Sequence, residues 1–142
     1  MQLHFRNKTP VLVSRRIIGF CGTLFGFNVG AVAVFPFVIV RDEKILASKE
    51  YINHESIHIR QYIETLIVGL VVIALLQYLY ALLVLRKSRT QAYYYMSHEQ
   101  EAHQNDHNLN YLKEKKLFSY YKYLLPKNKK KMDLVNGERV IY

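Results

Sequence analysis

An apolar stretch near the middle of the chain, residues 65–85, reads TLIVGLVVIALLQYLYALLVL and contains no charged residue. A helix needs ~20 apolar residues to cross the hydrocarbon core of a bilayer, and a small domain can hardly cover a helix that is apolar all round. The basic run RKSR follows at residues 86–89. Tyr78 and Tyr80 supply rings of the kind enriched at membrane interfaces. The pattern predicts a membrane-associated helix.

A second uncharged stretch covers residues 17–40. Its first part carries Gly22, Gly26 and Gly30, a GxxxG series that lets helices approach closely and is compatible with a membrane span. Its second part is rich in Val and Phe, contains Pro36 and ends in RDEK, which favours strands and a turn over a helix. We therefore expect strands over residues 30–40, with a transmembrane segment as the alternative.

The rest of the chain is more polar. Residues 93–123 place apolar or aromatic side chains at helical intervals, which predicts one or two amphipathic helices. Pro126 ends them, and PKNKKK opens a basic tail, residues 126–142, in which Asn136 and Gly137 predict a turn. No repeat or linker is evident. We expect one domain over residues 1–142, of the α+β class and mainly α, with a small N-terminal β element.

Composition narrows the function. Cys21 is the only cysteine, which excludes a Cys-rich zinc site and leaves His and carboxylates as metal ligands. The formal charge is +9, but the positive charge sits beside apolar runs and no nucleic-acid-binding module is recognised. The charge therefore favours an anionic membrane surface over nucleic acid as the partner.

The clearest chemical signal is HESIH, which contains His54, Glu55 and His58. Histidines four residues apart lie on one face of a helix and can converge on one metal ion, while the glutamate can reach a water on that ion. Asn53 is a good N-cap, so we expect the helix to start there, after a strand end. Gln61, one turn beyond His58, either orients a ligand or faces solvent. The alternative is that the histidines bind no ion.

A catalytic zinc site usually has a third protein ligand. The remaining segment rich in acids and histidines is SHEQEAHQNDH, residues 97–107. On a helix, Glu99, His103 and His107 share one face, whereas Glu101 lies on another and His98 is turned away. We predict Glu99 as the third ligand, with His103 as the alternative.

The pair HESIH and EQEAH resembles the gluzincin metallopeptidases, in which the third ligand begins an ExxA motif on a later helix. The pattern looks most like the membrane-embedded catalytic domains of antibiotic-sensing receptor peptidases and CAAX- and HtpX-type membrane proteases. It is also similar to small bacterial proteins with NHExIHxxQ and FExEAY motifs. The likeness covers residues 35–111. It implies that His54, His58 and Glu99 bind Zn2+ and that Glu55 is the general base; an Asp usually follows ExxA, where this chain has His103.

Geometry adds a constraint on the fold. A straight helix over residues 58–85 would be about 40 Å long, and residues 86–99 could retrace only ~20 Å of it as a helix. Glu99 can reach the histidines if residues 86–99 return in a nearly extended form or, as we expect, if the apolar helix is bent or forms a hairpin. We predict the reversal near Tyr78 and Leu79, with Gly69 as the other weak point.

Together these features predict a zinc-dependent, membrane-associated peptidase that hydrolyses a peptide bond in a peptide or protein substrate, located in the bacterial inner membrane. Residues 93–95, all tyrosines, or His103 are candidates to stabilise the oxyanion. Two alternatives remain: a metal-binding but inactive membrane protein, and a membrane adaptor without metal.

Overall fold

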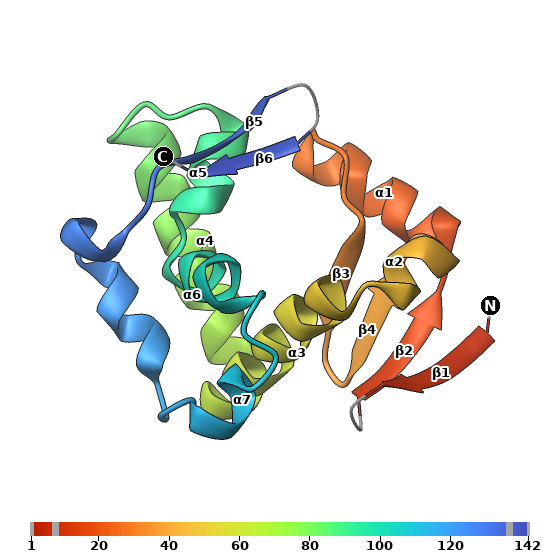
Figure 1. Ribbon diagram of the computed structural model, residues 1–142. Helices are drawn as coiled ribbons and strands as arrows, with labels where there is room; N and C mark the ends of the chain where they lie inside the picture. The colour runs from red at the N-terminus through yellow and green to blue at the C-terminus, as the bar shows by residue number, and fades with distance from the viewer. Residues whose placement is uncertain (1, 7–8, 136–137, 142) are drawn as a thin grey trace.

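The computed structural model describes residues 2–6, 9–135 and 138–141. A small N-terminal sheet is followed by a largely helical remainder (Figure 1). The predicted class, α+β and mainly α with a small N-terminal β element, is confirmed.

The sheet has the strand order β1-β2-β4-β3. β1 (Gln2–Arg6) pairs antiparallel with β2 (Thr9–Val13). The chain then passes through α1 (Arg15–Phe25) and β3 (Ala31–Val34), so that β4 (Phe37–Val40) runs parallel to β2 and antiparallel to β3. The strands expected within residues 30–40 are therefore present.

The first part of the apolar stretch 17–40 is helical instead. Ser14 caps α1, accepting a hydrogen bond from the Ile17 amide, and Gly26 ends the helix with a left-handed φ of 78°. Glycine adopts this conformation without steric cost. Thus the beginning of the stretch forms α1. Only the end of the stretch forms strands, β3 and β4, on the side of the sheet that faces the later helices.

The helix that carries HESIH begins earlier than predicted. α2 (Glu43–Ala47) leads directly into α3 (Lys49–Glu64), which is capped by Ser48. The expected strand end and N-cap at Asn53 are wrong: Asn53 lies inside α3, and its side-chain amide donates to the Asp106 carbonyl at 2.8 Å. This bond fixes α3 to the segment that follows the ExxA helix.

The apolar helix is bent, but not where we predicted. α4 (Val68–Leu83) runs through Tyr78 without interruption. The break lies at Leu66 and Ile67, whose φ values are positive (54° and 66°), beside the alternative weak point Gly69. In the described part of the chain no single helix is both long and apolar enough to cross a bilayer; α3 and α4 meet that test only as a pair bent by 110°.

After α4 the chain forms short helical segments: α5 (Arg89–Tyr95), α6 (Ser97–Asn105), α7 (Tyr111–Glu114), and the 3-10 helices η1 (Ser119–Leu124) and η2 (Pro126–Asn128). The helical character predicted for residues 93–123 is confirmed, although it is divided among several pieces. An extended residue, Met96, separates α5 from α6. This turn directs α6 back toward α3.

The basic tail contains strands that the sequence did not suggest. β5 (Met132–Val135) pairs antiparallel with β6 (Glu138–Ile141) and packs against α5. The turn predicted at Asn136 and Gly137 lies outside the described residues.

Candidate metal centre

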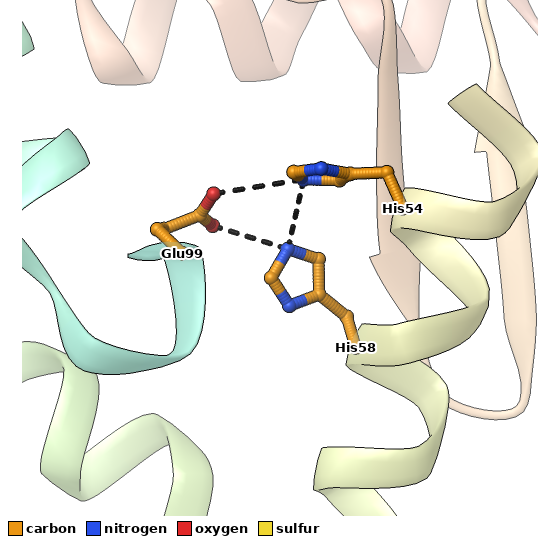
Figure 2. A group of neighbouring side chains, drawn as sticks. All are labelled: His54, His58 and Glu99. Atoms are coloured by element: carbon orange, nitrogen blue, oxygen red, sulfur yellow. Dashed lines mark hydrogen bonds and ion pairs between the residues drawn. The ribbon is translucent and has the colours of Figure 1, made fainter. Parts of the chain in front are cut away.

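The residues predicted as metal ligands meet between α3 and α6. His54 and His58 project from successive turns of α3 toward Glu99 in the first turn of α6 (Figure 2). His54 Nε2 lies 3.7 Å from Glu99 Oε2, and His58 Nε2 lies 3.3 Å from Glu99 Oε1. The two Nε2 atoms are 3.1 Å apart. All three side chains are buried.

Neighbouring acceptors decide which imidazole nitrogens carry protons. His58 Nδ1 lies 2.7 Å from Gln61 Oε1, and the Gln61 amide donates to Glu101 Oε2 at 2.6 Å and to the His98 carbonyl at 3.1 Å. Because both of these partners are acceptors, the Gln61 oxygen must face His58 and accept its Nδ1 proton. Gln61 is fully buried, so its solvent-facing interpretation was wrong and its orienting one fits.

His54 is oriented in the same way by a carboxylate. Its Nδ1 lies 3.6 Å from Asp106 Oδ2. In the neutral tautomers that these acceptors favour, both histidines direct an Nε2 lone pair toward Glu99. Three electron-pair donors that face one another require a cation, either a proton or a metal ion. The three side chains form a group that can hold a metal ion.

The pKa values of His54 and Glu99 also indicate that the site favours a positive charge. Burial disfavours protonated His54, but the neighbouring carboxylates of Asp106 and Glu99 outweigh it and raise the His54 pKa to about 10. Burial also opposes the charge on Glu99, yet His58 and the other neighbouring histidines hold the Glu99 pKa well below its ordinary value. Glu99 is therefore an anion at neutral pH, and a metal ion would displace a proton from His54.

A second group overlaps the first. His54, His103 and Asp106 also lie close enough to hold a metal ion. The His103 ring lies 4.3 Å from the His54 ring, and His103 Nε2 is 3.4 Å from Glu99 Oε2. The sequence patterns did not indicate Asp106, because the ExxA pattern has its Asp at the position of His103. The carboxylate that steadies His54 instead comes three residues later, just after α6.

Two other histidines differ from expectation. His98 is not turned away: its Nε2 lies 3.7 Å from Glu99 Oε1, and burial lowers its pKa to about 4. Because α6 starts only at Ser97, the first-turn side chains of His98 and Glu99 both reach α3. His107 lies beyond the end of α6 and its side chain is 70% exposed, so it does not share a helical face with Glu99.

Glu55 and Tyr93 add groups that can exchange protons or donate hydrogen bonds. Glu55 is buried, and burial raises its pKa, although the two histidines and the Ala33 amide oppose the shift. Tyr93 comes from α5; burial together with the charges of Glu99 and Glu55 raises its pKa well above the ordinary value. At neutral pH Tyr93 is therefore a hydroxyl donor beside the cluster.

Two cavities reach the cluster from different sides. A pocket of about 270 Å3, with polar and apolar walls, is lined by His54, His103 and Asp106, and a groove of about 580 Å3 is lined by His58 and Glu99. Glu55 and Tyr93 line both of them. A further cavity of about 680 Å3, beside α1 and residues 41–42, touches none of the cluster residues among those described. The residues of the candidate site thus line two cavities.

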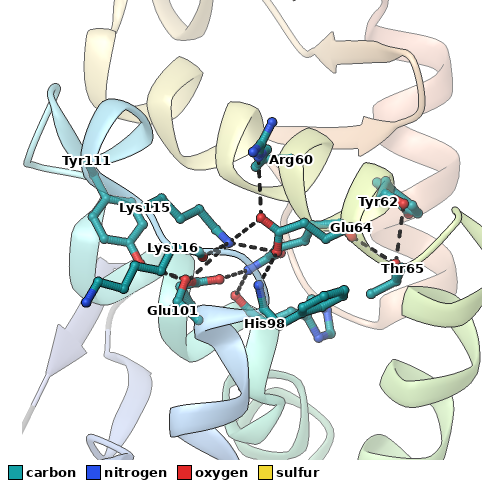
Figure 3. A network of polar contacts seen from close by, with 12 residues as sticks. Arg60, Tyr62, Glu64, Thr65, His98, Glu101, Tyr111, Lys115 and Lys116 are labelled. Carbon is teal, nitrogen blue, oxygen red and sulfur yellow. Dashed lines mark hydrogen bonds and ion pairs between the residues drawn. The ribbon is translucent and has the colours of Figure 1, made fainter.

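The Gln61 amide donates to Glu101, which belongs to a second buried polar cluster, the Glu101 network (Figure 3). Lys115 Nζ lies 2.8 Å from both oxygens of Glu64 and 3.6 Å from Glu101 Oε1. Glu101 also accepts hydrogen bonds from the hydroxyls of Tyr111 and Ser119. Glu101, which we expected on another helical face than Glu99, is thus fully buried within this network.

Comparisons of this chain with models of protein families, with curated proteins and with solved structures find no match. The resemblance to gluzincins therefore remains a prediction from two motifs, and the site is described by its own geometry.

Proposed function

We propose that the protein is a zinc-dependent peptidase that acts at a membrane, with His54, His58 and Glu99 as the zinc ligands. One observation carries the proposal: two Nε2 atoms, each oriented by an acceptor on the other ring nitrogen, face one buried carboxylate. Imidazole and carboxylate donors suit zinc, and three protein ligands in a site open to cavities are typical of catalytic rather than structural zinc.

The chain's own groups can supply the remaining chemistry. When bound, zinc polarises a carbonyl group and lowers the pKa of water toward ~7. Glu55, whose pKa burial has raised, takes a proton from the water that adds to the scissile carbonyl. It then delivers this proton to the amine nitrogen as the C–N bond breaks, which leaves a carboxylic acid and an amine; the acid then ionises and its proton passes to the amine.

Tyr93 is our candidate for stabilising the oxyanion. It lines both cavities with Glu55, and its raised pKa keeps the hydroxyl protonated. A hydroxyl that donates to the carbonyl oxygen as negative charge develops lowers the barrier. Gln61 and Asp106 act indirectly, because they fix the tautomers of the two histidines.

Membrane association is proposed from the exposed apolar side chains of α4 and α1. Leu76 and Leu83 on α4 are 63% and 72% exposed, and Phe20 on α1 is 70% exposed. Basic residues follow α4 directly at positions 86, 87 and 89. A large exposed apolar surface marks an interaction site, and the adjacent positive charge suits anionic lipid. We propose the bacterial inner membrane as the location.

A hydrolysis assay that compares the wild type with Glu55→Gln tests the proposed function. Zinc-loaded wild-type protein in detergent micelles should cleave an unfolded protein such as reduced casein, and Glu55→Gln should retain zinc but lose cleavage, because Glu55 is not a ligand. If the wild type binds zinc but shows no cleavage beyond that of Glu55→Gln, the inactive metal-binding alternative is favoured. Loss of zinc in Glu55→Gln would contradict the role assigned to Glu55.

A further inference from the structure

The groove beside the candidate site is bounded mainly by apolar side chains. α1 contributes Leu24, and one face of α4 contributes Val71, Ala74 and Leu75. Its volume, about 580 Å3, falls in the range of roughly 300–1,000 Å3 usual for ligand pockets. His58 and Glu99 reach the groove from α3 and α6. A molecule held by the apolar walls therefore contacts the candidate metal ligands.

The arrangement of α4 explains why its sequence is apolar all round. Residues 70, 71, 74, 75 and 78 line the groove, whereas 72 and 76 do not, although both are at least half exposed. Residues three or four apart share a helical face, so α4 presents one apolar face to the groove and another away from it. Exposure of the second face accounts for membrane contact; the first face needs a different explanation.

The second pocket beside the site differs from the groove in polarity. It is more polar than the groove: polar and acidic side chains, which include Asn28, Glu50 and Asp106, line it together with apolar and aromatic ones such as Phe27 and Tyr51. Since Glu55 and Tyr93 line both cavities, the boundary between apolar and polar surroundings passes through the pair of residues assigned to proton transfer and oxyanion stabilisation.

From this juxtaposition we propose that the substrate is a peptide cleaved at the border between an apolar segment and a polar segment. The apolar segment occupies the groove between α1 and α4, and the polar segment occupies the pocket beyond Glu55 and Tyr93. This inference rests on the proposed peptidase function. A peptide that was polar throughout would leave the groove walls in water, and one that was apolar throughout would desolvate the acidic pocket.

Peptide binding to zinc-loaded Glu55→Gln protein, which cannot cleave, tests the substrate class. The probes are fluorescein-labelled peptides in which a run of leucine and alanine adjoins a run of serine and asparagine, in both orders, together with a scrambled peptide of the same composition. Fluorescence anisotropy should show that one block peptide binds about tenfold or more tightly than the scrambled one, the equivalent of roughly two buried methylene groups.

Two neighbouring leucines supply a matched pair of variants. Leu75 lines the groove and is 55% exposed, whereas Leu76 does not line it and is 63% exposed. In the Glu55→Gln background, Leu75→Arg should weaken binding of the block peptide about tenfold or more, because it places a charge in the groove. Leu76→Arg should leave this binding within about twofold. Val71→Arg and Val72→Arg form a second pair, should a leucine variant fail to fold.

Several results would overturn the substrate class. These are equal binding of block and scrambled peptides, equal effects of Leu75→Arg and Leu76→Arg, and displacement of the peptide by phosphatidylcholine, which would assign the groove to an acyl chain. A dimer that Leu75→Arg dissociates would assign it to a second copy of this chain. Zinc content is measured in every sample: absence of zinc from the wild type contradicts the proposed function, whereas zinc with no preference for block peptides contradicts only the substrate class.

Discussion

Two buried polar clusters join α3 to later parts of the chain, and they differ in how their atoms are matched. In the Glu101 network, donors face acceptors: Lys115 Nζ lies 2.8 Å from both Glu64 oxygens, and the Phe118 amide donates to Glu64 at 3.0 Å. In the metal cluster, two imidazole nitrogens lie 3.1 Å apart and face the carboxylate of Glu99.

The difference indicates what each cluster does. A buried charge network whose partners satisfy one another holds the fold and has little capacity left for a ligand. A cluster in which acceptors converge requires a cation from outside the chain. Gln61 contacts both, since its oxygen faces His58 and its amide donates to Glu101. Variants in the two clusters should therefore separate stability from zinc affinity, and a Gln61 variant should affect both.

The largest effect is expected from Lys115→Met. The Lys115 side chain is fully buried between Glu64 and Glu101, so its loss removes a buried cation from two carboxylates, although Arg60 stays 3.4 Å from Glu64. Removal of one partner from a buried ion pair typically costs about 3–5 kcal/mol, and we expect a loss of this size in the free energy of unfolding measured with urea. Lys113→Met, at an exposed lysine on α7, is the control. Equal stability of the two variants would refute the structural role of the network.

Zinc affinity should depend most strongly on Glu99. Glu99→Ala removes a ligand and should weaken zinc binding more than ~100-fold, beyond the ~10–100-fold range of changes that act through a ligand's neighbours. His103→Ala should stay within that range. Competition with a chromophoric chelator measures both affinities. The reverse order would make His103 the third ligand and would argue against the gluzincin pattern.

Gln61→Leu should affect both clusters. His58 loses the acceptor that fixes its tautomer, so zinc affinity should fall ~10–100-fold. Glu101 also loses a donor, so unfolding should require less urea. Glu64→Gln is the matched variant, since Glu64 bonds to Lys115 and not to Gln61; it should lower stability and leave zinc affinity unchanged. An equal loss of affinity in both variants would mean that the clusters are not separable.

Proton release should accompany zinc binding. His54 has its pKa raised to about 10, so below that pH zinc must displace a proton from it. Affinity should therefore rise about tenfold per pH unit between about pH 7 and 9, whereas for an ordinary histidine, with a pKa near 6.5, it would level off in this range. Titration calorimetry in buffers of different ionisation enthalpy counts the protons. Asp106→Asn should lower the His54 pKa and flatten the dependence.

Local patterns predicted part of this site, and tertiary contacts supplied the rest. The spacing of His54 and His58 is a property of one helix, so the sequence was sufficient to place both on one face. The positions of His98 and Asp106 depend on where α6 begins and ends, which neither residue determines alone. For the same reason, burial of Gln61 could not be inferred, because it follows from its contact with Glu101 on another helix.

In the fold, too, local patterns predicted some features and not others. The strands near residues 30–40 follow from a dense Val and Phe pattern. The bend before α4 does not, because Leu66 and Ile67 have no intrinsic preference for positive φ. Local hydrogen bonds accompany the bend: the Ile67 amide donates to the Tyr62 carbonyl at 2.7 Å, and the Thr65 hydroxyl donates to the Gln61 carbonyl at 2.8 Å.

The zinc content of detergent-purified protein that has never been exposed to a chelator tests the central claim most directly. Elemental analysis of the wild type should give about one zinc per chain, and His58→Ala purified in parallel should give far less. Well under one zinc in the wild type, or equal zinc in both proteins, would contradict the assignment of His54, His58 and Glu99 as a zinc site.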